Sequence, residues 1–171
     1  VGADGVDRRI DVIATAMRVG LSATDLIDLD LAYAPPYGQA KDPVNQTGMF
    51  AHNVVTGELV LTGPDALTEE MPVLDVRTPE EYAAGHMPNS LNIPHTQLRD
   101  RLDEVRAWVD ENVGDQPFVV MCAAGVRSWI GYRIVRHAGF NVTMLSGGIQ
   151  TLRAWLGEKA EAVLVTGEGC A

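Results

Sequence analysis

The chain has 171 residues, 46% of them hydrophobic and 21% charged, which is enough apolar material for one ordinary core and excludes a disordered or low-complexity protein. Its 23 acidic and 13 basic residues give a net charge of -10, which argues against nucleic acid and anionic membrane surfaces as partners. No apolar run approaches the roughly 20 residues of a membrane span. Two cysteines are too few for a disulfide scaffold or a four-thiolate zinc site, so we expect a cytoplasmic protein without a metal.

Residues 1–57 show helical patterns around a proline-containing loop and no convincing strand. The apolar face of the first helix would consist of Ile10, Ile13 and Met17. Ser22 to Asp25 has the pattern of a capping box that opens a short second helix. Asp42-Pro43 has the pattern of an N-cap followed by proline at the first helical position. The helix that begins there is expected to bury Val44, Ala51, Val54 and Val55.

From about residue 58, short β-rich runs alternate with helical ones, which predicts an α/β fold whose mostly parallel sheet is covered on both faces. The predicted strands are residues 73–76, 90–93, 118–121 and 142–145. Thr78 and Glu81 form a capping box around Pro79 and predict a short helix. A longer helix carries Val126, Trp129, Ile130 and Ile134 at helical spacing and ends at Gly139. Trp129 and Trp155 are interpreted as packing residues.

The most informative stretch is Met121-Cys122-Ala123-Ala124-Gly125-Val126-Arg127-Ser128, where a cysteine follows the clearest predicted strand and a helix begins at about Gly125. Ligands of parallel α/β sheets bind at the carboxyl ends of strands. A tight loop that enters a helix turns its N–H groups inward, and small residues leave room for a guest. With Arg127 adding positive charge, we expect the pKa of Cys122 to fall from about 8.5 toward neutrality, which gives a thiolate nucleophile.

Six motifs stand in a fixed order along the second part of the chain. They are Leu74-Asp75-Val76-Arg77, Glu80-Glu81-Tyr82, Gly85-His86-Met87-Pro88, Asn92-Ile93-Pro94, the loop of residues 122–128 and Leu145-Ser146-Gly147-Gly148. Together they resemble a rhodanese domain, a sulfurtransferase module, over about residues 58–158. The resemblance implies a rhodanese-like α/β fold with a mainly parallel sheet of about five strands and helices on both faces.

By this resemblance, Cys122 is the catalytic residue: it accepts a sulfane sulfur, becomes a persulfide and passes the sulfur to a nucleophilic acceptor. The N–H groups of the loop would stabilise the charged outer sulfur. That loop comprises Ala123, Ala124, Gly125, Val126, Arg127 and Ser128. Asp75 and Arg77 are expected to brace the site, Asp75 by an ion pair with an arginine near the loop. His86 is expected to be a hydrogen-bonded scaffold residue. The implied donors and acceptors are thiosulfate and low-molecular-weight persulfides.

The length of the loop separates two chemistries on this fold. Residues 122–127 make six positions, the length of the family's sulfur-transferring loop, whereas related phosphatases and arsenate reductases use a loop one residue longer. The space enclosed by the shorter loop suits one sulfur atom better than a tetrahedral phosphate, which favours sulfur transfer. Phosphatase or arsenate reductase activity is kept as an alternative. A non-catalytic interaction module is the other alternative, and the presence of Cys122 argues against it.

A second resemblance rests on residues 7–17, 28–38 and 41–45, with Ala32-Tyr33-Ala34-Pro35-Pro36-Tyr37 as its most specific part. These look like the end of the dimerisation domain of pyridine nucleotide-disulfide oxidoreductases of the coenzyme A-disulfide reductase type, some of which carry a C-terminal rhodanese domain. The resemblance implies a homodimeric parent that uses FAD and NAD(P)H, with coenzyme A persulfide as a plausible carrier. No G-x-G-x-x-G follows a predicted strand, so we expect no cofactor in this chain itself.

We therefore interpret the chain as a piece of a longer protein with three parts. These are residues 1–57 as a helical remnant of the dimerisation domain, residues 58–158 as the rhodanese domain and residues 159–171 as a C-terminal tail. For Cys170, in the glycine-rich tail, a mobile terminal thiol without a role is the favoured interpretation, and acceptance or resolution of a persulfide is the alternative. For Tyr33 and Tyr37, packing and an approach to a partner's active site in the parent both remain open.

Overall fold

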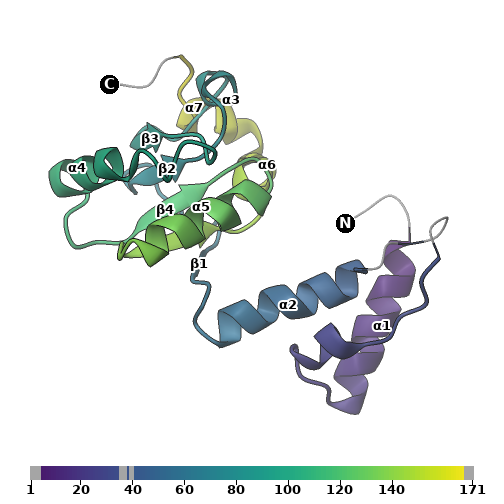
Figure 1. The fold of residues 1–171 in the computed structure, drawn as a ribbon. Coiled ribbons are helices and arrows are strands. Elements are labelled where there is room, and N and C mark those ends of the chain that lie inside the picture. The colour runs from purple at the N-terminus through teal and green to yellow at the C-terminus, as the bar shows by residue number, and fades with distance from the viewer. Residues whose placement is uncertain (1–4, 35–37, 39–40, 168–171) are drawn as a thin grey trace. The chain divides into compact units, whose positions relative to one another are not determined.

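The chain folds as two compact units, Val1–Leu59 and Val60–Ala171, in a computed structural model that describes residues 5–34, 38 and 41–167 (Figure 1). The first unit is helical, and the second contains a sheet with helices around it. The cysteine loop, residues 122–128, lies wholly within the second unit. Within the described part of the chain, no helix has the length and apolar character needed to cross a membrane.

The sheet of the second unit has five strands in the order β1-β5-β4-β2-β3, and every pairing is parallel. The strands are β1 (Leu61–Thr62), β2 (Val73–Asp75), β3 (Ser90–Asn92), β4 (Phe118–Met121) and β5 (Val142–Leu145). This confirms the predicted α/β architecture with about five strands. The central strand β4 has all its side chains buried, as its continuous apolar sequence predicts. β1 was not predicted, because two residues are too few to leave a periodic pattern.

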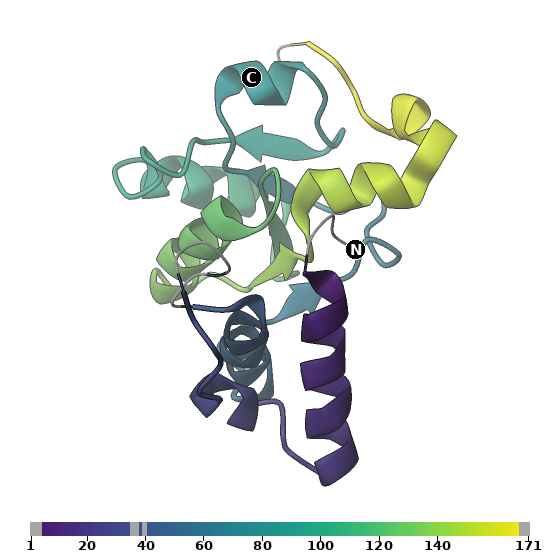
Figure 2. The ribbon, with the colours of Figure 1, turned by 90° about the vertical axis from the view of Figure 1, so that its right-hand side faces the viewer.

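Helices cover both faces of this sheet. They are α3 (Pro79–Ala83), α4 (Leu102–Asn112), α5 (Val126–His137) and α6 (Gly148–Leu156), followed by the short η2 (Gly157–Lys159) and α7 (Ala160–Val163). Met121 of β4 belongs to the same buried cluster as Ile149 of α6. Its neighbour Val120 points the other way, toward α5, where a Cβ at Gly131 would lie 3.4 Å from the Val120 side chain. Figure 2 shows α5 and α6 on opposite sides of the strands.

Part of the predicted C-terminal tail folds back onto this unit. After α7, Val165 pairs with His86 in an antiparallel bridge, with N–H to carbonyl distances of 2.9 Å in both directions. Val163 and Leu164 pack against the buried cluster beneath α6. Residues 159–167 therefore contribute to the packing of the second unit.

Several apolar side chains on the helices of this unit face solvent. Trp155 is 62% exposed, so its predicted packing role is wrong. On α6, Ile149, Leu152 and Leu156 follow an i, i+3, i+7 spacing toward the sheet, which turns Trp155 away from it. On α5 the buried face consists of Ser128, Gly131, Tyr132, Ile134 and Val135, so Val126 and Ile130 lie outside it. Trp129 is half-buried, and its ring stacks on Tyr132 at a centroid distance of 5.8 Å.

The first unit contains α1 (Val6–Val19), a single 3-10 turn η1 (Asp25–Asp28) and α2 (Pro43–Val55), which meet around Ala16, Leu26 and Val44. The predicted start of α2 is confirmed, because the Asp42 carboxylate accepts the Val44 N–H at 2.9 Å and Pro43 occupies the first turn. The side-chain amide of Asn45 donates to the carbonyl oxygens of Leu26, Ile27 and Leu29, which ties α2 to the chain around η1.

The apolar faces predicted for this unit are partly wrong. Met17 is 73% exposed and Ile10 59%, and on α2 Val55 is 74% and Val54 39% exposed. The helices of this small unit meet along one line of contact, so side chains elsewhere on their surfaces have no neighbour to pack against. The predicted reciprocal hydrogen bonds between Ser22 and Asp25 are present, but the turn that follows is the 3-10 turn η1, and Thr24, which precedes it, makes no side-chain capping bond.

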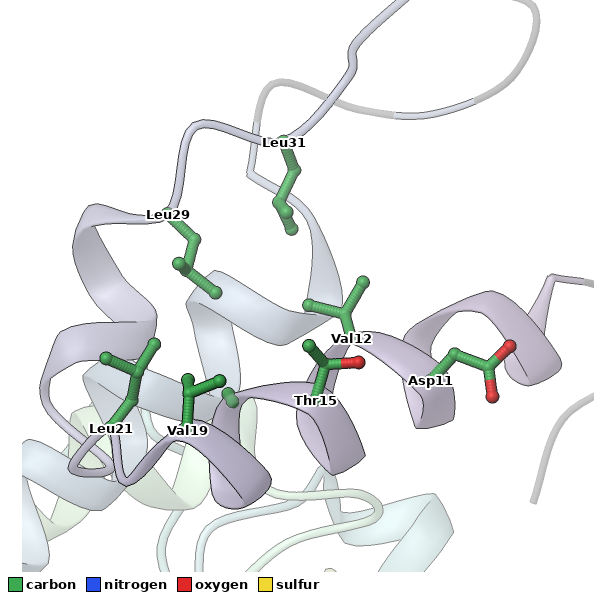
Figure 3. Close-up of a pocket in the computed structure, with 8 residues that line it drawn as sticks. Asp11, Val12, Thr15, Val19, Leu21, Leu29 and Leu31 are labelled. Carbon is green, nitrogen blue, oxygen red and sulfur yellow. The ribbon is translucent and has the colours of Figure 1, made fainter.

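An apolar pocket of about 320 Å³ lies in the first unit between α1 and the chain on either side of η1 (Figure 3). Its lining consists of Asp11, Val12, Thr15, Ala16, Val19, Leu21, Leu29 and Leu31. Among the described residues of this unit, no side chain fills the space between α1 and these leucines.

Candidate active site

The cysteine loop begins where β4, the middle strand of the sheet, ends. Cys122 follows Met121 directly and is 1% exposed, while Ala124 in the same loop is exposed. Gly125 turns the chain into α5 with a φ of +123°, a conformation that favours glycine over any residue with a side chain. The sulfur therefore lies at the carboxyl edge of the parallel sheet, beneath a surface loop and at the start of a helix.

Two hydrogen-bonding groups of the loop contact the Cys122 sulfur. The Gly125 N–H donates to Sγ at 3.2 Å, and the Cys122 thiol donates to the Ser128 hydroxyl oxygen at 3.4 Å, while that hydroxyl donates to the Gly125 carbonyl at 2.8 Å. Burial raises the pKa of the Cys122 thiol. Hydrogen bonding by the Ser128 hydroxyl and by the N–H groups of Gly125, Ser128 and Ala124 lowers this pKa by more, so its net value lies below the ordinary one. The direction of this pKa shift agrees with the sequence-based prediction, and the Gly125 N–H is the loop N–H group that contacts the sulfur.

Replacing Ser128 with alanine is expected to move the midpoint of Cys122 ionisation upward by roughly one pH unit, because the thiolate loses a hydroxyl donor. The ultraviolet absorbance of the thiolate measures this directly against pH, with Cys122→Ser supplying the baseline. Ser90→Ala is the matched control, since the Ser90 hydroxyl bonds to Met87 and Tyr82 and not to the cysteine. An unchanged midpoint in Ser128→Ala would show that the N–H groups alone set the ionisation.

The first residues of α6 form hydrogen bonds to the carbonyl groups of the cysteine loop. The Ile149 N–H donates to the Cys122 carbonyl at 2.9 Å, and the Gln150 N–H donates to the Ala123 carbonyl at 3.1 Å. In a trans peptide the N–H points opposite to the carbonyl, so the N–H groups of Ala123 and Ala124 are turned away from α6. Gly148, with a φ of +63°, lies so close to the loop that a Cβ there would be 2.6 Å from the carbonyl oxygens of both Cys122 and Ala123.

Arg127 forms an ion pair with Glu81, so its positive charge is not free for the cysteine loop, contrary to the prediction from the sequence. Its two terminal nitrogens donate to the Glu81 carboxylate at 2.6 and 2.7 Å. This contact holds the pKa of Glu81 at about 2. Glu81 also accepts the Thr78 N–H at 3.0 Å in the predicted capping box at the start of α3. The sequence indicated Glu81 as a helix cap, but a partner 46 residues away leaves no local signal.

Asp75 and Arg77 form a buried ion pair at the end of β2. The Arg77 guanidinium contacts the Asp75 carboxylate at 2.6 Å and also donates to the carbonyl oxygens of Glu81 and Gly85. The predicted ion pair of Asp75 therefore exists, but its partner is Arg77 and not an arginine of the loop. The pair braces the turn that carries Glu81, so its link to the cysteine loop is indirect.

The rhodanese-like domain model matches residues 63–154, which include the strands β2 to β5 but not β1, together with the whole cysteine loop. This chain belongs to the rhodanese-like family. The predicted family resemblance is thereby confirmed, and the fold and the loop of this rhodanese-like domain agree with it.

Two solved structures resemble both units of the chain. The reduced CoADR-RHD of Bacillus anthracis is 37% identical with a TM-score of 0.82, over 95% of this chain and 28% of that one. The NAD-dependent persulfide reductase of A. fulgidus is 40% identical with a TM-score of 0.72, over 86% of this chain and 26% of that one. The predicted likeness to proteins of the coenzyme A-disulfide reductase type is therefore confirmed as a similarity.

Curated relatives match shorter parts. An HTH-type transcriptional regulator of Mycobacterium tuberculosis is 39% identical over 72% of this chain and 47% of its own length. The coenzyme A disulfide reductase of Staphylococcus aureus is 48% identical over 51 residues, which are 30% of this chain and 12% of that enzyme. The rhodanese-like chain thus spans about half or less of these relatives.

His86 is a packed residue of the rhodanese-like domain. It is 4% exposed, its Nδ1 lies 2.9 Å from the Tyr82 carbonyl, and its ring stacks on the Tyr82 ring at 3.7 Å. Together with its main-chain bridge to Val165, these contacts join α3 to the end of the chain. They are the contacts of a scaffold residue.

Three other residues were singled out from the sequence, Tyr33, Tyr37 and Cys170. Tyr33 is 55% exposed in the first unit, and Tyr37 and Cys170 lie outside the described residues. Across the described ranges, no three His, Cys, Asp or Glu side chains converge in the way that a metal site requires. The site that the second unit assembles is therefore a single cysteine in a bowl of donors, flanked by the Arg127 and Glu81 pair.

Proposed function

We propose that this rhodanese-like domain is a sulfurtransferase that carries sulfane sulfur as a persulfide on Cys122. The observation that carries the proposal is the position of the Cys122 sulfur at the carboxyl edge of the parallel sheet, within hydrogen-bond distance of the Gly125 N–H at 3.2 Å and the Ser128 hydroxyl at 3.4 Å. The donors of this loop lower the pKa of the Cys122 thiol although burial raises it. A thiolate is the attacking form of cysteine, and the same donors suit the negative charge on the outer sulfur of a persulfide.

The reaction has two displacements at sulfur. The Cys122 thiolate attacks the terminal sulfur of a donor, a new S–S bond forms, and the donor's own bond to that sulfur breaks to release a thiolate or sulfite. An acceptor thiolate or cyanide then attacks the outer sulfur of the Cys122 persulfide and restores the thiolate. Because Cys122 is 1% exposed, a donor in which the terminal sulfur projects from the rest of the molecule fits this site best.

Two features favour sulfur over phosphate at this site. The loop from Cys122 to Arg127 has six residues, and the guanidinium that would bind a phosphate dianion is occupied by Glu81. The hydrogen bonds to the sulfur also favour chemistry over a purely docking role, since a structural thiol needs no stabilised thiolate.

For the whole protein, we propose a larger FAD- and NAD(P)H-dependent reductase of coenzyme A disulfide, persulfide or polysulfide in which this chain is the sulfur-carrying module. The support is the similarity of both units to CoADR-RHD and to a persulfide reductase. The cofactors would bind outside this chain, which has no G-x-G-x-x-G after any strand. A homodimeric, cytoplasmic protein that exchanges sulfur with coenzyme A persulfide is part of the same proposal.

Incubation with thiosulfate or cysteine persulfide is expected to add one sulfur atom, about 32 Da, to Cys122, and cyanide is expected to remove it as thiocyanate. Intact-protein mass spectrometry and a thiocyanate assay measure the two halves. Cys122→Ser should abolish both, because an alcohol cannot form the persulfide. Absence of the adduct with both donors in the unaltered chain would refute the proposed function. Hydrolysis of an aryl phosphate that disappears in Cys122→Ser would establish phosphatase chemistry in its place.

A further inference from the structure

The charge of the cysteine loop is neutralised by a residue outside it. Arg127 is the one charged residue of the stretch from Cys122 to Ser128. Its terminal nitrogens both donate to Glu81, at 2.6 and 2.7 Å, in a pair of which the side chains are 27% and 38% exposed. The loop and its partner therefore have no net charge before the cysteine ionises, and the favourable field at the sulfur comes from N–H and O–H dipoles.

Arg127 and the sulfur interact despite this pairing. The Glu81 hydrogen bond is the main cause of the raised pKa of Arg127, and the charge of the Cys122 thiolate contributes in the same direction. Arg127 directly precedes Ser128, whose hydroxyl lies 3.4 Å from the Cys122 sulfur, so the guanidinium belongs to the same short loop as the reacting atom. Removing the carboxylate that cancels it would make the environment of the sulfur more positive without changing the loop itself.

Sulfur donors differ in the charge that they bring to this site. Thiosulfate carries two negative charges and approaches a third on the Cys122 thiolate, so its encounter depends strongly on local positive charge. A persulfide R–S–SH brings at most one negative charge on the terminal sulfur. The Arg77 guanidinium is bound to Asp75 and cannot compensate, and the chain as a whole has a net charge of -10.

We propose that Glu81 is a specificity-determining residue that, by neutralising Arg127, disfavours doubly charged oxyanion donors and makes persulfides the preferred donor class. This inference rests on the proposed sulfurtransferase function. In the preferred step, the Cys122 thiolate attacks the terminal sulfur of R–S–SH and forms a new S–S bond, while the S–S bond of the donor breaks. The R–S⁻ that leaves takes the proton from the new Cys122 persulfide. The products are the Cys122 persulfide anion and R–SH, with no net oxidation or reduction.

The test is Glu81→Gln, which keeps the length of the side chain and can still accept the Thr78 N–H while losing the charge. We expect kcat/KM for thiosulfate to rise about fivefold, mainly through KM, while kcat/KM for cysteine persulfide changes less than about twofold. The ratio of the two donors is the readout, because a general disturbance of α3 would lower both rates together. Added salt should reduce the gain with thiosulfate, since the effect is electrostatic.

Glu104→Gln is the matched control. Glu104 forms a pair of the same 2.6 Å length with Arg101 at the start of α4, so this variant removes one negative charge from an ion pair outside the loop, and its donor ratio should equal that of the unaltered chain. An unchanged ratio in Glu81→Gln, with an active unaltered chain, would overturn this inference alone. No adduct from either donor in the unaltered chain would instead refute the proposed function.

Discussion

Replacing Arg77 with leucine is expected to lower the free energy of unfolding of the second unit by about 3–5 kcal/mol, because it leaves the Asp75 carboxylate buried without its partner. Asp75 is fully buried, and the Arg77 guanidinium donates to both of its oxygens through Nε and to one of them through a terminal nitrogen. The leucine variant keeps only the hydrogen bond from the main-chain N–H of residue 77. The same guanidinium also satisfies the carbonyl oxygens of Glu81 and Gly85, which would lose their donor. Urea denaturation followed by tryptophan fluorescence measures the change, since all three tryptophans lie in the second unit.

Two further variants show whether burial is the cause. Arg101→Leu breaks a pair of equal length, 2.6 Å, with Glu104, but its side chains are 34% and 52% exposed, so a loss below about 1 kcal/mol is expected. The double variant Asp75→Asn with Arg77→Leu should recover part of the loss, because it removes the uncompensated charge. Equal losses in Arg77→Leu and Arg101→Leu would contradict the role assigned to the buried pair.

Gly148→Ala is expected to cost about 2–4 kcal/mol and to disturb the cysteine loop. The positive φ of +63° disfavours any side chain, and the added Cβ would lie 2.6 Å from the carbonyl oxygens of Cys122 and Ala123. These carbonyls accept the N–H groups of Ile149 and Gln150, so a shift of α6 would release the loop that surrounds the sulfur. Denaturation and the Cys122 ionisation midpoint are both expected to change, the midpoint moving to higher pH.

Gly139→Ala separates the two causes. Gly139 also has a positive φ, +91°, but its Cβ would meet no atom within 4 Å, so this variant carries the cost of the backbone conformation without the clash. Its loss of stability should be near 1 kcal/mol, and its Cys122 midpoint should not move. If both glycine variants behaved alike, the close approach of α6 to the loop would have no energetic weight.

Features encoded by neighbouring residues were predictable from the sequence. The Asp42-Pro43 start of α2, the Thr78 and Glu81 capping box and the strand 118–121 all appear in the structure where the sequence predicts them. The same holds for the cysteine at the end of the central strand and for the direction of its pKa, because the donors come from residues 124–128 of the same loop. Each of these depends on contacts within a few residues.

The faces of the helices were less predictable. Trp155, Met17 and Val55 are exposed although their spacing is that of packing residues. Periodicity shows that a helix has an apolar face, but which neighbour covers it, and how far around the helix that contact extends, depends on elements distant in the chain. On α5, for example, Gly131 lies so close to the sheet that a Cβ there would be 3.0 Å from the Val76 side chain, a contact that the spacing of apolar residues does not reveal.

Local geometry and apolar patterning were enough to predict a parallel α/β unit with a cysteine at the end of its clearest strand, because strands, caps and the loop depend on residues that are close together in the chain. Which charges meet, Asp75 with Arg77 and Arg127 with Glu81, became known from the folded arrangement alone. Ion pairs form between any side chains that the fold brings within reach, and a chain of 13 basic and 23 acidic residues allows many pairings that no local pattern distinguishes. The environment of the sulfur, and with it the donor preference proposed for this site, is therefore a property of the fold.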